Sequence, residues 1–159
     1  MLKAAVITVS DRASEGVYED VSGSTIREIL KEAYPDIELK SKVISDAKEK
    51  IIRAFEEHSD CDWIFTTGGT GISPRDVTPE AAEEFCDTPL PGISETIRAE
   101  SYKETPNAML SRGYAGRKGN TLIVNFPGSV KAVRLCTRII IPIIKHAQEM
   151  IKGKGHETE

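Results

Sequence analysis

The stretch TTGGTGISPRDVTPEA, Thr66–Ala81, joins a hydrophobic run to the start of a helix and carries three glycines within four positions, at Gly68, Gly69 and Gly71. Glycine has no Cβ and adopts positive φ at little cost. A domain that places this much backbone freedom directly after a strand either turns sharply there or lets another group approach its backbone closely. The stretch predicts a strand, a glycine turn and a helix that begins at Thr78-Pro79.

Four segments around this stretch have the pattern of β-strands. Ala4–Val9, Trp63–Thr67 and Thr121–Phe126 are continuous apolar or β-branched runs, which is typical of strands buried on both faces. Ile37–Ile44 alternates apolar and polar residues, which indicates a strand nearer the edge of a sheet.

Helical patterns separate these strands. The expected helices start at a capping box of Thr25 and Glu28, at Asp46, at Thr78-Pro79, near Ile93 and near Val130, the last being interrupted at Pro142 and ending near Gly153. Strands that alternate with helices predict an α/β sandwich on a largely parallel sheet. A turn predicted at Gly116–Gly119, directly before the last strand, adds one antiparallel pairing, so the sheet is expected to be mixed.

Composition narrows the class of protein. The chain has 159 residues, a net charge of -4 and a pI near 5.5. It fits one domain, residues 1–152, with a polar tail at 153–159. The acidic balance argues against broad binding to nucleic acid or to a membrane surface.

The cysteines and histidines indicate the cellular compartment and whether the chain has a zinc site. Cys61, Cys86 and Cys136 are scattered, so reduced thiols in a cytoplasmic protein are expected. The apolar run before Asp11 is too short for a signal peptide. The three histidines are dispersed, which predicts no zinc site.

The candidate chemistry lies in four loops that follow strands. They are Ser10-Asp11-Arg12, Ser45-Asp46, Thr66–Asp76 and Asn125–Ser129. In open α/β sheets, ligands bind beyond the carboxyl ends of the strands. If the four strands are neighbours, all four loops face one cleft.

The TTGGTG segment is interpreted as a phosphate cradle. Its glycines allow successive N–H groups to converge on an anion, and Thr66, Thr67 and Thr70 add hydroxyl groups. The alternative is a purely structural turn. The segment fits no common nucleotide motif, because Pro74 stands where GxGxxG needs its third glycine and no Walker GK[ST] sequence occurs.

The carboxylates near the cradle have structural alternatives. Asp46 can be a helix N-cap, Asp76 can order the turn before Thr78, and Asn125–Ser129 can be a strand exit with a cap. The segment Gly116–Gly119 imitates the GXXG clamp of an RNA-binding KH domain, but a hairpin turn explains it better at this net charge.

These segments together resemble the MogA/MoaB family, which includes the G domains of plant Cnx1 and of gephyrin. The resemblance rests on AVITVSDRAS, on TTGGTGISPRDVTPEA and on MLSRGYAGRKGNTLIVNFPGS, and it extends to KHAQEMIKG near the end of the chain. It implies a three-layer α/β/α domain with a mixed sheet, usually a trimer.

The resemblance also implies an activity in molybdenum cofactor biosynthesis. MogA-type members use MgATP to adenylylate molybdopterin and release pyrophosphate. The family's two important carboxylates fall on Asp46 and Asp76, which are the expected catalytic residues and Mg²⁺ ligands, and Mg²⁺ is commonly held by one or two carboxylates plus substrate phosphates. The expected substrate-binding residues come from all the loops: Ser10, Asp11, Arg12, Thr66, Thr67, Gly68, Gly69, Thr70, Gly71, Arg75, Asn125, Pro127, Gly128 and Ser129.

Two classes of function stay open. The sequence Pro127-Gly128-Ser129-Val130 is closer to the MoaB branch than to MogA, which favours a module that binds pterin, or an oligomeric scaffold, without adenylyl transfer. The intact RDVTPEA block and the Asp46/Asp76 pair favour the enzyme. The expected partners are molybdopterin, ATP, further copies of the chain in a trimer or hexamer, and a downstream protein that inserts molybdate.

Overall fold

The structure is a computed structural model and describes residues 1–17 and 19–153. The predicted polar tail, from residue 154 on, lies outside the described residues. The described chain folds around a six-stranded sheet with the order β2-β1-β3-β6-β5-β4.

The sheet is mixed, as the sequence predicts. The strands β1 (Lys3–Val9), β2 (Glu38–Ile44), β3 (Trp63–Thr67) and β6 (Thr121–Phe126) run parallel, whereas β5 (Ala115–Lys118) is antiparallel to β6 and to the short β4 (Thr88–Pro89). The turn expected at Gly116–Gly119 is shorter than predicted: Gly116 to Lys118 belong to β5, and the reversal is at Gly119, whose φ is +56°.

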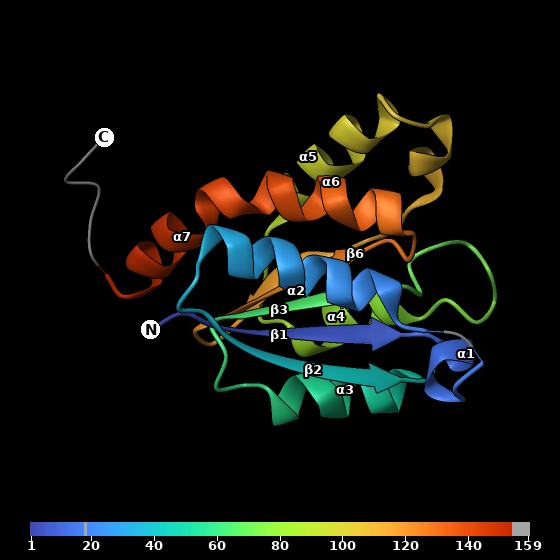
Figure 1. Cartoon of the computed structure of the whole chain (residues 1–159), viewed down its shortest axis with the longest axis horizontal. Helices are drawn as coiled ribbons and strands as arrows, with labels where there is room; N and C mark the ends of the chain where they lie inside the picture. Colours follow the sequence, from blue (N-terminus) through green and yellow to red (C-terminus); the bar gives the residue numbers. More distant parts are fainter. Residues whose placement is uncertain (18, 154–159) are drawn as a thin grey trace.

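Helices cover both faces of the sheet, which makes the three layers that the family resemblance implies (Figure 1). They are α1 (Asp11–Ser14), α2 (Val21–Ala33), α3 (Lys48–Glu57), α4 (Thr78–Phe85), α5 (Pro91–Tyr102), α6 (Val130–Ile140) and α7 (Ile144–Ile151), with 3-10 turns η1 (Pro106–Leu110) and η2 (Ile141–Ile143). The helix after Val130 is interrupted at Pro142, as expected, because proline lacks the N–H that a helix interior needs.

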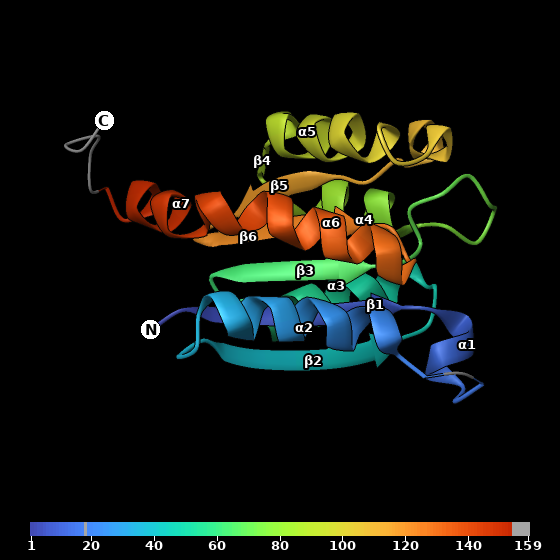
Figure 2. The ribbon, with the colours of Figure 1, turned by 45° about the horizontal axis from the view of Figure 1, so that its top comes forward.

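Two apolar cores hold the layers together. One packs the side chains of α2, α5, α6 and α7 against Val6, Phe65 and Phe126, and the other packs α3 and α4 against Ile7, Ile64 and Ile123. In Figure 2, α2 and α6 lie in front of the sheet and α3 and α4 behind it. The continuous apolar runs are therefore buried on both faces. None of the helices in the described residues is long and apolar enough to cross a membrane.

Three predicted helix caps are wrong: the hydroxyl of Thr25 donates to the carbonyl of Val21 within α2, and Asp46 and Thr78 bond to more distant residues. The N-cap of α2 is Asp20, which accepts the N–H of Gly23, and not Thr25. The helix α3 begins after Ala47 without a side-chain cap, so Asp46 is not its cap. Thr78 is the first residue of α4, and its hydroxyl donates to the carbonyl of Gly68.

The parallel strands end together at one edge of the sheet. Thr67 of β3 is paired with Thr8 of β1 and with Phe126 of β6, and Val9 is paired with Ile44 of β2. The four parallel strands are therefore neighbours in the sheet, which the sequence alone did not decide. The loop after β3 projects beside the carboxyl end of β1 (Figure 1).

Candidate active site

The loops after β3 and β6 are joined by hydrogen bonds that run between strands and helices. The hydroxyl of Thr67 donates to the carbonyl of Pro127 over 2.7 Å, and the N–H of Gly68 donates to the carbonyl of Phe126 over 3.1 Å. Ser22, in the first turn of α2, donates to the carbonyl of Gly128 over 2.6 Å. These bonds fix the glycine turn against the start of α6.

The first two glycines of the turn are required by the backbone. Gly68 and Gly69 have φ of +98° and +69°, a region that residues with a Cβ rarely adopt. A Cβ on Gly68 would lie 2.3 Å from the carbonyl oxygen of Val9, and one on Gly69 would lie 2.3 Å from the hydroxyl of Thr78. The turn is sharp and also closely packed.

The same turn leaves donors available to a ligand. Thr78 donates to the carbonyl oxygens of Gly68 and Gly69 through its hydroxyl and its N–H. Within the described residues, no hydrogen bond uses the N–H groups of Gly69, Thr70 or Gly71. Successive N–H groups of this kind bind anions, as the interpretation of TTGGTG as a phosphate cradle requires.

Asp11 and Asp46 connect the loops after β1 and β2. The N–H of Asp11 donates to Oδ2 of Asp46 over 3.0 Å, and the N–H of Asp46 donates to Oδ1 of Asp11 over 2.9 Å. Arg75 reaches across from the glycine loop and donates to both oxygens of Asp11, the shortest bond being 2.7 Å. Asp11 is therefore a structural link, and it holds both Asp46 and Arg75 in place.

Asp76 ends the glycine-bearing loop, and a local bond orients it. Its Oδ2 accepts the N–H of Ser73 over 3.0 Å. A Cβ on Gly71 would lie 2.9 Å from the same oxygen, so the third glycine makes room for this carboxylate. Asp46 approaches Gly69 in a similar way, because a Cβ there would lie 3.1 Å from its Oδ1.

The surroundings shift the pKa values of Asp11 and Asp46 in opposite directions. The N–H of Asp46, and then the guanidinium of Arg75, hold the pKa of Asp11 below its ordinary value. Burial raises the pKa of Asp46, and the negative charges of Asp11 and Asp76 add to the rise. Asp46 is thus a partly buried carboxylate that a bound cation would stabilise.

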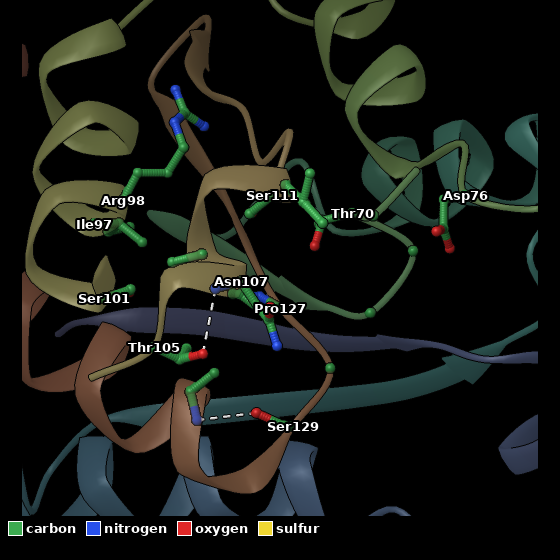
Figure 3. A pocket seen from close by; sticks show the side chains of 17 residues that line it. Thr70, Asp76, Ile97, Arg98, Ser101, Thr105, Asn107, Ser111, Pro127 and Ser129 are labelled. Carbon is green, nitrogen blue, oxygen red and sulfur yellow. Dashed lines mark hydrogen bonds between the residues drawn. The ribbon is translucent and has the colours of Figure 1, made fainter. Parts of the chain in front are cut away.

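Two cavities meet at the glycine turn. The first, of about 520 Å³, lies between the turn, α5, η1 and the start of α6, and Figure 3 shows Thr105, Asn107 and Ser129 on its wall with Asp76 at the far side. The second, of about 490 Å³, lies over the ends of β1 and β3 and is lined by four carboxylates, Glu19, Asp20, Asp46 and Asp76. The residues common to both are Gly68, Gly69, Asp76, Gly128 and Ser129.

Residues 5–146 match the family described as a probable molybdopterin binding domain. The chain belongs to this family. The chain is 41% identical over 152 residues to the molybdopterin adenylyltransferase of Helicobacter pylori strain ATCC 700392 / 26695, in an alignment that covers 93% of this chain and 86% of that protein.

Solved structures of the family have the same fold. The molybdopterin biosynthesis Mog protein of Mycobacterium ulcerans superimposes with a TM-score of 0.89 at 38% identity, over 95% of this chain and 99% of that one. The molybdopterin biosynthesis enzyme MoaB of Thermus thermophilus does so with a TM-score of 0.86 at 37% identity, over 97% and 98%. The MogA/MoaB resemblance and the α/β fold are confirmed.

Most of the residues expected to bind substrate in this molybdopterin-binding domain line a cavity. The two cavities at the glycine turn are lined, among other residues, by Ser10, Asp46, Thr67, Gly68, Gly69, Thr70, Gly71, Asp76, Pro127, Gly128 and Ser129. Asp11 and Arg75 line a neighbouring hollow beside Lys50. The roles of these residues in binding remain predictions.

Three of the expected residues lie elsewhere. Thr66 and Asn125 are buried inside the sheet, where the amide of Asn125 donates to the hydroxyl of Thr66 over 2.9 Å and its oxygen accepts the N–H of Tyr114. Arg12 is exposed on α1 and lines none of these three cavities. The structure does not bring these three side chains to the site.

The cavity walls also include residues that motif reading did not single out. These are Glu19, Asp20 and Ser22 beside the acidic cavity and Ile97, Arg98, Ser101, Thr105, Asn107, Leu110 and Ser111 beside the other. Asp20 lies upstream of the predicted capping box, whose position is more than one helical turn too late. The residues of α5 and η1 belong to no sequence motif. They reach the cavity because η1 folds back over the glycine turn, which the sequence alone does not show.

The site fits a magnesium ion held jointly with substrate phosphates, and not a metal held by the protein alone. The described residues contain no cluster of three or more His, Cys, Asp or Glu side chains that could hold a metal. Asp46 and Asp76 line the same cavity, and each has one oxygen bonded to a backbone N–H and one that makes no hydrogen bond within the described chain. One or two carboxylates plus phosphate oxygens is the usual arrangement for Mg²⁺.

Proposed function

We propose that this chain transfers the adenylyl group of ATP to the terminal phosphate of molybdopterin, giving adenylyl-molybdopterin and pyrophosphate. The observation that carries the proposal is the junction of two ligand-sized cavities over a glycine turn with unused N–H groups and two carboxylates. A reaction between two phosphate-bearing substrates needs such a junction. The sequence identity that this chain shares with molybdopterin adenylyltransferases supports the choice of substrates.

The chemistry needs positioning more than it needs a reactive side chain. An oxygen of the molybdopterin phosphate attacks the α-phosphorus of ATP, and the bond from that phosphorus to the bridging oxygen breaks as pyrophosphate leaves with the electron pair. A phosphate monoester is already ionised near neutral pH, since its second pKa is about 6. The protein therefore has no proton to remove, in keeping with a site that lacks His and Cys among its lining residues.

The two cavities suit different substrates. The acidic cavity accepts a triphosphate only together with a cation, so we assign the MgATP phosphates to it, with Asp46 and Asp76 as the residues that would hold Mg²⁺. The bound ion would neutralise charge on the phosphates. The other cavity has Arg98 on its wall beside uncharged polar groups, such as Asn107 and Ser111. The polar groups and the apolar Ile97 and Leu110 suit the edges and faces of a pterin.

The backbone of the glycine turn would act where the cavities meet. The N–H groups of Gly69, Thr70 and Gly71 are available to oxygens that carry charge during transfer. Donors that are fixed before the reaction stabilise such charge at no cost of reorganisation. Ser129 and the first turn of α6 face the same junction.

The test is a stoichiometric product assay. The purified protein is incubated with molybdopterin and MgATP, and adenylylated pterin and pyrophosphate are measured. Equal amounts of both, dependent on pterin, support the proposal. Tight pterin binding with no adenylylated product refutes it and supports the alternative, a MoaB-like binding or scaffold module.

We also propose a homo-oligomer, a trimer in the first place and a hexamer as the alternative, acting in the cytoplasm and passing its product to a molybdate-inserting protein. Exposed apolar side chains support association, among them Tyr102, Met109 and Leu110, which are 54%, 69% and 52% exposed. Three free cysteines fit a reducing compartment. Sedimentation that shows a stable monomer at micromolar concentration would reject the oligomer.

A further inference from the structure

Arg112 connects both ends of the loop that carries Asp76. Its Nε donates to the carbonyl of Gly71 over 2.8 Å, and its Nη2 donates to the carbonyl of Asp76 over 2.9 Å. Its backbone N–H donates to the carbonyl of Thr70 over 2.8 Å, and its Nη1 pairs with Glu80 of α4. Arg112 therefore donates hydrogen bonds to three carbonyl groups of the loop and also links the loop to α4.

The loop between those carbonyl groups has few other supports. Ile72, near its tip, is 68% exposed. Inside the loop, the N–H of Ser73 donates to the carboxylate of Asp76, and the N–H of Asp76 donates to the carbonyl of Ser73 over 2.9 Å. Arg75 adds one tether on the outer side, to Asp11. The direction of the Asp76 carboxylate thus depends on the loop being closed.

We propose that Arg112 is a positioning residue that holds the Asp76 carboxylate at the junction of the two cavities by closing the Gly71–Asp76 loop. The inference rests on the proposed function for the role of Asp76. Arg112 itself lines neither of the two cavities that meet at the glycine turn, so it acts through the loop and not by contact with substrate.

The chemistry of the side chain explains why this position needs arginine. A guanidinium presents several N–H donors in a rigid planar fork, whereas an ammonium is a single point charge on a flexible stem. Arg112 uses its three side-chain nitrogens on three different acceptors. Lysine keeps the charge but cannot bridge two carbonyl groups in a fixed geometry.

Three variants separate the two roles of the Arg112 side chain, which are its positive charge and the bridge that its hydrogen bonds form between the carbonyl groups of Gly71 and Asp76. Arg112→Gln removes both, Arg112→Lys keeps the charge and loses the bridge, and Glu80→Gln keeps the bridge and removes only the ion pair to α4. Glu80 lines no part of the two cavities, and a glutamine oxygen can still accept from the guanidinium, which makes Glu80→Gln the matched control.

The expected result has three parts. Both Arg112 variants lose turnover by about 10- to 100-fold, the size of effect that a misplaced catalytic group produces. Both need more Mg²⁺ for half-maximal rate, and amide exchange at Ser73 and Asp76 becomes faster while exchange in β3 does not. Glu80→Gln stays near the wild-type protein in all three measurements.

Other results overturn the inference. Full turnover in Arg112→Lys would show that charge alone is needed. Faster exchange at Ser73 without loss of turnover, or loss of turnover without faster exchange, would separate the loop from catalysis. An unfolded Arg112→Gln shows itself by fast exchange throughout the sheet, and Arg112→Lys then decides.

A second readout keeps this inference distinguishable from the proposed function. Binding of Mn²⁺ with ATP is followed by paramagnetic broadening in wild-type protein and in Arg112→Lys. If wild-type protein forms no adenylylated pterin but Arg112→Lys still weakens Mn²⁺–ATP binding, the proposed function fails and the positioning role stands. Equal Mn²⁺–ATP binding by the two proteins overturns the positioning role.

Discussion

Asp11 and Asp46 each accept the backbone N–H of the other, over 2.9 Å and 3.0 Å, across loops that are 35 residues apart in the sequence. The two bonds use one oxygen of Asp46 and leave its Oδ1 facing the glycine turn, next to Gly69. The exchange explains why a short loop after an edge strand can hold a carboxylate in a fixed direction. It also excludes the simpler view of Asp46 as a helix cap.

The first prediction concerns the two candidate carboxylates. Asp46→Asn and Asp76→Asn keep the size of the side chain and an oxygen that can accept the N–H of Asp11 or Ser73. Both variants are expected to stay folded and to bind pterin, and to lose turnover by on the order of 10²–10³. Asp76→Asn is expected to lose more, because Asp76 lines both cavities and Asp46 lines one.

Steady-state rates at saturating Mg²⁺ and ATP, with thermal unfolding as the check on folding, measure this effect. Near-normal turnover in Asp76→Asn would remove that residue from the mechanism. A large drop in melting temperature with proportionate loss of activity would return both residues to a structural role.

The second prediction is a pH dependence centred on Asp46. Burial, with the charges of Asp11 and Asp76, raises its pKa above the ordinary 3.8, so the folded chain holds a proton there at pH values where the unfolded chain has lost it. This group alone therefore favours the fold at acid pH and disfavours it as pH rises through the raised pKa. Asp46→Asn is expected to gain free energy of unfolding relative to wild-type protein at about pH 7 and to gain less at about pH 4.

Chemical denaturation of the two proteins at those pH values tests the sign. Turnover follows the opposite direction, because a protonated Asp46 cannot hold a cation, so the rate falls as pH drops through the raised pKa. A larger gain for Asp46→Asn at the acid pH than at neutral pH would show that the pKa of Asp46 is not raised.

The sequence predicts the four parallel strands well because their signal is local, whereas the short β4 and β5 are not predicted as strands. Trp63–Thr67 and Thr121–Phe126 have the same bounds in the structure, since a continuous apolar run of this length is stable only when both of its faces are buried. The convergence of the loops follows from the parallel order of the strands. The cap expected at Ser129 is confirmed, since its hydroxyl accepts the N–H of Ala132. The caps expected at Asp46 and Thr78 fail, because these side chains bond to Asp11 and Gly68, and no spacing rule shows partners so distant.

Part of the site was predictable because its residues are close together in the sequence. The glycine turn and Asp76 belong to one contiguous motif, so their placement could be read from it. Arg112 stands in MLSRGYAG, a segment that contributes to the family resemblance but has no local pattern that indicates a clamp. Its role depends on η1 bringing the chain back to the glycine turn, which only the three-dimensional fold shows.

The third prediction compares glycines on the two sides of the cavity junction. A Cβ on Gly128 would lie 3.5 Å from Cα of Gly68, an ordinary contact, and Gly128 lines both cavities. Gly128→Ala is expected to fold with a change in stability within about 0.5 kcal/mol. It is expected to lose turnover by about 10- to 100-fold, because its methyl group occupies the place where the substrates meet.

Gly68→Ala is the contrasting variant. Its φ of +98° and the overlap with the carbonyl of Val9 predict a loss of about 2 kcal/mol or more in the free energy of unfolding. Gly92→Ala, which adds a methyl group in open space, serves as the control for both. If Gly128→Ala reacts at the wild-type rate, the junction is not where transfer occurs.

The fourth prediction concerns the cysteines. Burial raises the pKa of Cys61 and Cys86 to about 11 and that of Cys136 to about 12. Reaction with a thiol reagent near neutral pH is expected to be slow in the folded protein and fast in denaturant, since the thiolate is the reactive form. Rapid labelling of the folded protein with no loss of structure would contradict the burial of these thiols.

The most direct test of the central claim follows the label of ATP in a single reaction with molybdopterin and Mg²⁺. With ATP labelled at the α-phosphorus, the account predicts that the label appears on the pterin, in an amount equal to the pyrophosphate released. With ATP labelled at the γ-phosphorus, the label is expected only in pyrophosphate. Label from the γ-position on the pterin, or AMP formed without any labelled pterin, would contradict adenylyl transfer by this protein.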